Sequence, residues 1–312
     1  MNTHEGDLTH LTIICPVYNE DQVIPLFFSR LKPIINELTS RYIVELLFLN
    51  NASTDGTYDM IESLRKKYAF VYIITLSTNV GYQRSLECGL RNAQGKVLVF
   101  IDVDCEDPPE MLLEFVKYYE QGYDIVYGER VDREEIRIIK LLRKFFYHIL
   151  HRVADENVIL YMAEFSLLTS EVRDAMLCDH NSFPFIRSSI GRVGFHRIGI
   201  PYKRHRRIAG QTHYNILGMI IFAVAGILSS STLPLRIPIY FLPFWLLSTT
   251  ILGAIQIESG NPWFLLLNLL ISCTYIGSSV AFIALYVART YKNGLGRPNY
   301  FIHKRFTHLQ TD

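Results

Sequence analysis

Several features that would place a chain of 312 residues in a familiar class are absent from this sequence. Its five cysteines include no Cys-x-x-Cys pair and lie far apart, which argues against a zinc knuckle or a disulfide scaffold. The formal net charge is only +1, so we expect no nucleic-acid partner that depends on a strong positive field. The polar residues 1–7 have no apolar core behind them and are not expected to form a secretory signal.

Charge is almost missing from residues 214–288, where Arg236 and Glu258 are the only charged side chains. Two uncharged stretches in this region, Ile237–Ile257 and Trp263–Ala288, are each long enough to cross a bilayer, which takes ~20 residues of helix. The alternative is a pair of buried core helices in a soluble protein, although such helices rarely stay uncharged over this length. The sequence therefore predicts two transmembrane helices joined by a short turn.

Basic residues flank the apolar region on both sides: Lys203, Arg204, Arg206 and Arg207 before it, and Arg289, Lys292, Arg297, Lys304 and Arg305 after it. The positive-inside rule then places both flanks in the cytoplasm, with Glu258 outside, and a bacterial inner membrane is the expected location. Tyr214–Leu235 is uncharged but is broken by a Ser/Thr run and Pro234. A third span would carry the basic tail across the membrane, so we predict an interfacial helix there.

Short apolar runs alternate with helical patterns in the N-terminal part. We predict strands over residues 11–15, 42–49, 71–75 and 97–101, with helices ending near residue 38 and covering residues 57–67 and 82–93. This βαβα order is typical of a mainly parallel sheet covered on both faces. Because each polar motif follows a strand, we expect the motifs to meet at one edge of the sheet.

The acidic run Asp-Val-Asp-Cys-Glu-Asp-Pro-Pro-Glu, residues 102–110, directly follows the apolar strand at 97–101. Carboxylates at Asp102 and Asp104 can both reach one divalent cation, and hard oxygen ligands suit Mg²⁺ or Mn²⁺ carrying a diphosphate. The alternative is that Asp102 and Asp107 only cap turns and solubilise a loop. The following Pro-Pro-Glu indicates the start of a helix.

Five motifs occur in an order that is far more specific than any of them alone: Pro16-x-Tyr18-Asn19-Glu20, Ser53-Thr54-Asp55-Gly56-Thr57, Asn79-x-Gly81, Asp102-x-Asp104-x-x-Asp107-Pro108-Pro109-Glu110 and Arg204-x-x-Arg207-x-x-Gly210. Together they resemble family 2 glycosyltransferases with a GT-A fold. With the basic neck, the two spans and the tail Arg297-Pro298-x-Tyr300, residues 10–302 resemble the polyprenyl-phosphate glycosyltransferases, the group of bactoprenol glucosyltransferases and dolichol-phosphate mannose synthases.

The resemblance implies a role for each matching residue on the donor side. Pro16, Tyr18, Glu20, Asn50 and Asp55 are implied to hold the nucleoside, and Asp102 faces the nucleotide. Asp104 and Glu106 are implied to hold Mg²⁺ or Mn²⁺, and the catalytic contribution of Asp104 is made through that metal. Asn50, Asn51 and Glu106 depart from the family pattern, where Asp is commoner at the first two places and Gln at the third. A core aromatic at Tyr18 and a helix N-cap at Asp55 remain open as structural alternatives.

On the acceptor side, Arg130 and Arg207 match family positions that contact phosphates, and arginine suits a phosphate because its donors form a planar fork. Arg204 is a further candidate for the acceptor phosphate, and so is His213, which replaces the usual Lys of the family. The cluster at residues 203–207 can equally contact anionic head groups of the membrane. Glu164 stands where the family carries an Asp near the reaction centre, and Ser166 replaces an Arg. We predict a catalytic or acceptor-positioning role for Glu164, with a purely structural acid as the alternative.

These observations predict four regions: a cytoplasmic GT-A catalytic domain at residues 1–212, an interfacial helix at 213–235, two transmembrane helices at 236–290 and a cytoplasmic tail at 291–312. The predicted reaction is the inverting transfer of a hexose from a nucleotide sugar, such as UDP-glucose, to undecaprenyl or dolichyl phosphate. Alternatives are a GDP-mannose-dependent synthase, a catalytically silent membrane scaffold and a processive synthase, whose Gln-x-x-Arg-Trp motif is absent. Relatives of this kind can form homo-oligomers, which the sequence leaves open.

Overall fold

The computed structural model describes residues 8–131, 159, 162–179, 181–209, 224, 226–228 and 231–309. Within them, seven strands form one sheet: β1 (Thr9–Val17), β2 (Tyr42–Asn50), β3 (Val71–Thr75), β4 (Val97–Phe100), β5 (Ile125–Val131), β6 (Met162–Thr169) and β7 (Arg197–Lys203). The helices are α1 (Ile24–Leu38), α2 (Thr57–Lys67), α3 (Tyr82–Asn92), α4 (Met111–Glu120), α6 (Ser170–Leu177), α7 (Ile186–Val193), α9 (Leu233–Ser259) and α10 (Pro262–Gly294), followed by the short 3-10 helix η1 (Lys304–Phe306).

The sheet has the strand order β3-β2-β1-β4-β6-β5-β7 and is mainly parallel. Strands β3, β2, β1 and β4 run in one direction, β6 is antiparallel to both of its neighbours, and β5 and β7 are parallel to each other. The predicted α/β fold with a mainly parallel sheet and two C-terminal apolar helices is confirmed. The predicted strands and helices of residues 11–101 all form, with ends that differ by a few residues.

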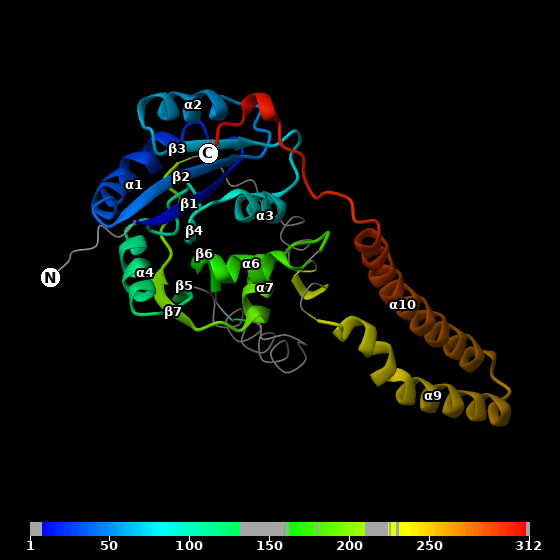
Figure 1. Cartoon of the computed structure of the whole chain (residues 1–312). Helices are drawn as coiled ribbons and strands as arrows, with labels where there is room; N and C mark the ends of the chain where they lie inside the picture. Colours follow the sequence, from blue (N-terminus) through cyan, green and yellow to red (C-terminus); the bar gives the residue numbers. More distant parts are fainter. Residues whose placement is uncertain are drawn as a thin grey trace.

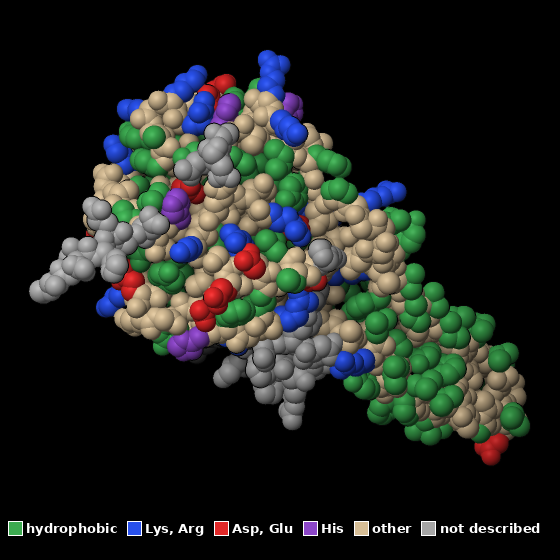
Figure 2. Space-filling view, in the orientation of Figure 1, with side chains coloured by type: hydrophobic (Ala, Val, Ile, Leu, Met, Phe, Trp, Pro, Cys, Tyr) green, Lys and Arg blue, Asp and Glu red, His purple; other side chains and the backbone are tan. Residues whose placement is uncertain are grey.

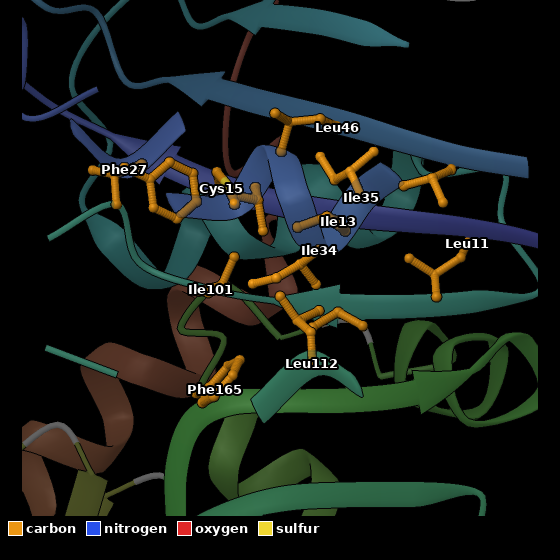
Figure 3. Packing of buried hydrophobic residues seen from close by; sticks show 14 of the residues in the cluster. Leu11, Ile13, Cys15, Phe27, Ile34, Ile35, Leu46, Ile101, Leu112 and Phe165 are labelled. Carbon is orange, nitrogen blue, oxygen red and sulfur yellow. The ribbon is translucent and has the colours of Figure 1, made fainter. Parts of the chain in front are cut away.

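Two apolar clusters cover opposite faces of the sheet, because side chains alternate between the faces along each strand. Leu11, Ile13 and Cys15 of β1 pack with α1, α2 and α4, as Figure 3 shows for Phe27 and Leu112. Ile14, which lies between Ile13 and Cys15 in the sequence, packs on the opposite face of the sheet with α3, α6 and α7. Helices therefore lie on both faces (Figure 1), and this sandwich fixes the strand ends that carry the polar motifs.

Helix α3 approaches the sheet especially closely. A Cβ atom added to Gly89 would lie 2.6 Å from Cγ2 of Ile14 and 2.7 Å from Cδ1 of Leu49. Only glycine permits this spacing without moving neighbouring side chains. Since Tyr82 and Gln83 begin this helix, the close packing also fixes the position of the first turn of α3.

Helices α9 and α10 form an apolar hairpin that projects from the α/β unit (Figure 1). Both are long and apolar enough to cross a membrane, judged by length and composition. The Tyr275 hydroxyl of α10 donates to the Pro238 carbonyl of α9, 2.9 Å away, and its ring stacks on Trp245. Hydrophobic side chains cover the projecting hairpin in Figure 2, whereas charged side chains gather on the α/β unit. Most of the predicted interfacial helix lies outside the described residues, so its boundaries stay a prediction.

The chain returns from α10 to the sheet, and its C-terminal segment pairs with the edge strand β3 (Figure 1). The amide of His308 donates to the carbonyl of Ile73 at 2.7 Å, and the reverse bond is 3.0 Å long. Farther along, the amide of His303 donates to Thr75 O at 2.8 Å. The chain thus runs from the α/β unit into α9 and returns to it after α10. The start of α9 and the end of α10 therefore both lie at the end of the hairpin that is nearer the α/β unit (Figure 1).

Candidate active site

The loops that follow β1 and β2 are joined by hydrogen bonds at the edge of the sheet. The amide of Asn19 donates to Ser53 Oγ at 3.0 Å, and the amide of Thr54 donates to Asn19 Oδ1 at 2.8 Å. Next to them, the amide of Glu20 donates to Thr57 Oγ1 at 2.8 Å. These contacts bring the Pro16-to-Glu20 and Ser53-to-Thr57 motifs into one structure, as the sequence predicts.

Asp55 organises the turn before α2. Its carboxylate accepts hydrogen bonds from the amides of Thr57 at 3.0 Å and Asp21 at 3.3 Å. Burial by itself would raise the pKa of Asp55, but the hydrogen bonds from Thr57 and Asp21 outweigh it and hold the pKa below its ordinary value. The structural role considered for Asp55 is therefore present, and a ribose or base contact remains a prediction.

Asparagine side chains connect the second loop to the third. Asn50 Oδ1 accepts from the amide of Ser53 at 3.0 Å. Asn51 donates to Asn79 Oδ1 and accepts from the amide of Val80, each at 3.0 Å. An amide can donate and accept at once, which a carboxylate cannot, so the departure from Asp at these two positions suits this network.

Within the described part of the chain, three non-glycine residues have positive φ angles, and each lies in a loop at this edge: Asn19 at 55°, Ala52 at 57° and Cys105 at 55°. The left-handed region costs such residues free energy and persists where the surroundings hold it, often at functional sites. Asn19 tolerates it best, because asparagine is among the residues that commonly adopt it. The coincidence of the three marks this edge as the candidate active site.

Asp102 and Asp104 follow β4 as the sequence predicts. Asp102 Oδ1 accepts a hydrogen bond from the Tyr82 hydroxyl of α3 at 2.8 Å. Burial, and then the nearby carboxylates Asp104 and Asp107, raise the pKa of Asp102 to about 8. Burial is also the main cause that raises the pKa of Asp104 and of Glu106. Such crowding of buried acids favours the approach of a cation.

Two arginines from the segment after β7 provide positive charge at this site. Arg207 forms ion pairs with Glu20 and, at 3.5 Å, with Asp104, and Arg204 pairs with Glu106. The backbones are joined as well, because the amide of Ile208 donates to the carbonyl of Asp104 at 3.0 Å. The predicted phosphate-binding residues Arg204 and Arg207 are thus brought against the predicted donor and metal residues.

Arg130, predicted to contact phosphate, lies in a buried cluster with Asp107 and Tyr202. Its Nη2 atom is 3.0 Å from Asp107 Oδ2, and its Nε donates to the Tyr202 hydroxyl at 3.0 Å. That hydroxyl also donates to Asp107. Side-chain exposure is 16% for Arg130 and 2% for Asp107, so Arg130 serves first to neutralise a buried acid. Its contact with a phosphate remains a prediction.

Glu164 lies on β6, and its side chain is only 8% exposed. Its carboxylate pairs with Arg187 of α7 and accepts from Gln83 Nε2 of α3 at 3.3 Å. Tyr82 and Gln83, neighbours in α3, bind Asp102 and Glu164 respectively, so the two carboxylates lie at the same site. The sequence does not indicate roles for Tyr82, Gln83 and Arg187, because their partners Asp102 and Glu164 lie on other elements.

A metal requires a suitable set of donors. The residues predicted to hold it, Asp104 and Glu106, offer hard carboxylate oxygens, which fit Mg²⁺ or Mn²⁺. No cluster of three or more His, Cys, Asp or Glu side chains is preformed in the part of the chain that the structure describes. Two carboxylates still fit a cation that brings its remaining oxygen ligands with a diphosphate. His213 lies outside the described residues, and its role stays a prediction.

Comparison with known proteins places this site in a family. The family described as Glycosyl transferase family 2 matches residues 12–187, which include the loops after β1, β2 and β4 and the strand β6 that carries Glu164. The chain belongs to glycosyl transferase family 2. The predicted family and the predicted enzyme class, a glycosyltransferase, are confirmed. The matched region ends at Arg187, so it includes both members of the Glu164–Arg187 ion pair.

The curated relatives extend the similarity over nearly the whole chain. An uncharacterized glycosyltransferase of Bacillus subtilis, YkcC, is 30% identical over 95% of this chain and 94% of its own. A prophage bactoprenol glucosyl transferase homolog of Escherichia coli is 28% identical over 94% and 98%. Among solved structures, a Pyrobaculum calidifontis mannosyltransferase in complex with GDP-Man and Mn²⁺ aligns with a TM-score of 0.45 and 16% identity over 91% of this chain and 76% of that one.

Proposed function

We propose that this glycosyltransferase moves a hexose from a nucleotide sugar, with a UDP-sugar as the first candidate, to a polyprenyl phosphate at the cytoplasmic face of a membrane. The observation that carries the proposal is the joining of two parts in one chain: the site at the edge of the sheet, and the apolar hairpin that leads away from it. Relatives named bactoprenol glucosyl transferase that match both parts support a lipid acceptor.

The donor side consists of the loops after β1, β2 and β4. Asp104 and Glu106 would hold the divalent cation, which when bound neutralises charge that builds on the departing diphosphate. Arg207 can exchange its pairing with Glu20 and Asp104 for diphosphate oxygens, since guanidinium binds either group. Asp102, held by Tyr82, then faces the sugar nucleotide.

The reaction needs little acid or base chemistry, because a phosphate oxygen of the acceptor is already ionised near neutral pH. That oxygen forms a bond to the anomeric carbon as the bond from this carbon to the diphosphate breaks, and the nucleoside diphosphate leaves with the electron pair. Attack from the face opposite the leaving group inverts the anomeric centre. The protein's task is to orient the two phosphorylated substrates and to balance their charges.

The proposal is tested with full-length protein in native membranes supplied with undecaprenyl phosphate and Mn²⁺. Labelled UDP-glucose, UDP-galactose, UDP-N-acetylglucosamine and GDP-mannose are compared by extraction of the product into organic solvent. We expect one UDP-sugar to give a lipid product with the wild-type chain and none with Asp104→Asn. Labelling from GDP-mannose alone would identify the alternative mannose synthase, and no labelling from any donor would favour the silent scaffold.

A further inference from the structure

Arg187 occupies an unusual position on the acceptor side of the site. It is the second residue of α7, and its side chain is 30% exposed while its partner Glu164 is nearly buried. The guanidinium pairs with Glu164 through Nη2, but its Nε is buried and has no acceptor among the residues that the structure describes. A guanidinium carries five N–H donors, and a buried donor without an acceptor is costly. This geometry indicates that Arg187 is arranged for a further anionic oxygen.

The other arginines of the site already serve acids of the donor side. Arg207 and Arg204 pair with Glu20, Asp104 and Glu106, and Arg130 is enclosed with Asp107. A second phosphate entering beside these carboxylates needs a cation of its own. Among the described residues, Arg187 is the arginine that touches Glu164.

The first two residues of α3 fix the distance between the donor and acceptor sides. Tyr82 donates to Asp102, and the next residue, Gln83, donates to Glu164. The side-chain oxygen Oε1 of Gln83 also accepts from the amide of Ile186 at 3.0 Å, which holds the first turn of α7. The side chain of Gln83 therefore contacts both Glu164, the partner of Arg187, and the first residue of the helix that carries Arg187.

The segment just before α7 is attached to the C-terminal end of α10. The amide of Ser182 donates to Asn293 Oδ1 at 3.0 Å, and its hydroxyl donates to the carbonyl of Lys292 at 3.2 Å. The guanidinium of Arg289 lies 4.6 Å from the ring centre of Phe183. Arg187 is only four residues from Phe183, so it lies near the place where the end of α10 meets the α/β unit. A lipid with its tail beside α10 would present its phosphate here.

We propose that Arg187 binds the phosphate of the lipid acceptor, and that Glu164 and Gln83 act as positioning residues that aim its guanidinium. This assignment rests on the proposed function. Glu164 neutralises Arg187 and pairs with its Nη2, so an arriving phosphate would take Nε and compete with Glu164 for the positive charge. In this arrangement Glu164 orients the guanidinium of Arg187 toward the phosphate, and it does not have to remove a proton from the acceptor.

The test compares binding of farnesyl phosphate and farnesol to full-length protein in detergent micelles. The wild-type chain should bind the phosphate more tightly than the alcohol, and Arg187→Gln should reduce that preference at least about tenfold, the loss expected for a charge-assisted contact. Arg187→Lys keeps the charge without the planar fork and should retain part of the preference. Arg192→Gln is the matched control on the same helix, because Arg192 pairs with the partly exposed Asp179.

Two further readouts separate phosphate binding from a structural role. Arg187→Gln should raise KM for the lipid phosphate while binding of UDP with Mn²⁺ is unchanged, and an equal loss of UDP binding would overturn the assignment in favour of the donor diphosphate. Glu164→Gln should bind farnesyl phosphate more tightly than the wild type, because the competing carboxylate is gone, yet should have a lower kcat. Weaker binding by Glu164→Gln contradicts the competition.

The outcomes also distinguish this assignment from the function on which it rests. A wild-type chain that neither binds nor glycosylates farnesyl phosphate overturns both. A wild-type chain that does so, together with an Arg187→Gln variant that binds the phosphate as tightly, overturns the Arg187 assignment alone. Should Arg187→Gln fail to fold, Arg187→Lys decides the question, since wild-type preference and KM in that variant would leave no role for the fork.

Discussion

Replacing Asp107 by alanine should be among the most destabilising single changes in the α/β unit. The Asp107 carboxylate is 2% exposed and neutralises Arg130, whose side chain is 16% exposed. It also accepts from the Tyr202 hydroxyl. Burial by itself would lower the pKa of Arg130, but Asp107 and Tyr202 outweigh it and keep the pKa above its ordinary value. The variant would therefore retain a charged, buried guanidinium without its counterion.

Removing one partner of a buried ion pair costs about 3–5 kcal/mol. For a unit of roughly 200 residues, this corresponds to a fall in Tm on the order of 10 °C. The matched control is Asp179→Ala, which breaks the more exposed pair with Arg192 and should cost at most about 1 kcal/mol. Arg130→Met in the Asp107→Ala background should recover part of the loss, because it removes the uncompensated charge.

Thiol reactivity provides the assay, because Cys15, Cys88 and Cys105 are buried and react only when the unit opens. The two exposed cysteines, Cys178 and Cys273, are first changed to serine to remove background labelling. Heating in detergent with a thiol-reactive dye then reports the unfolding of the α/β unit. An Asp107→Ala shift no larger than that of Asp179→Ala would refute the argument that this pair stabilises the fold.

Three further predictions, which use four variants, test other parts of the molecule. Asp104→Asn should abolish Mn²⁺-dependent transfer with little change in Tm, and Mn²⁺ binding followed by electron paramagnetic resonance should weaken at least about tenfold, as expected on loss of a coordinating carboxylate. Ser259→Cys should be labelled by an impermeant thiol reagent from outside the cell, whereas Lys304→Cys should be labelled only after permeabilisation. Gly89→Ala should lower the free energy of unfolding by about 1–3 kcal/mol, measured by the same dye assay, because its Cβ would collide with Ile14.

Each of these has a contrary outcome. Wild-type turnover or Mn²⁺ binding by Asp104→Asn would remove it from the metal site. Labelling of Lys304→Cys in intact cells, without labelling of Ser259→Cys, would reverse the proposed orientation. A Gly89→Ala variant as stable as the wild type would mean that α3 can move away from the sheet without loss.

The local sequence determined the secondary structure and the order of the motifs. Apolar runs such as residues 97–101 fix strands because their side chains have to be buried on both faces, and the acids that follow them have to lie at the strand ends. The two long apolar helices α9 and α10 could also be predicted locally, because length and composition alone decide whether a helix can span a bilayer. The family resemblance followed from these motifs in their order.

Only the tertiary structure decided which charges meet. Arg207 and Glu20 are 187 positions apart, and nothing in their neighbourhoods indicates that they pair. The resemblance predicts that Arg130 contacts a phosphate, yet the fold encloses it with Asp107 and Tyr202, while Arg187 is brought to Glu164. Secondary structure follows from periodicity within about ten residues, but the partner of a charge depends on how strands order in the sheet and helices cover it. The acids of the site could therefore be predicted from the sequence, whereas the arginines that pair with them were determined by the tertiary structure.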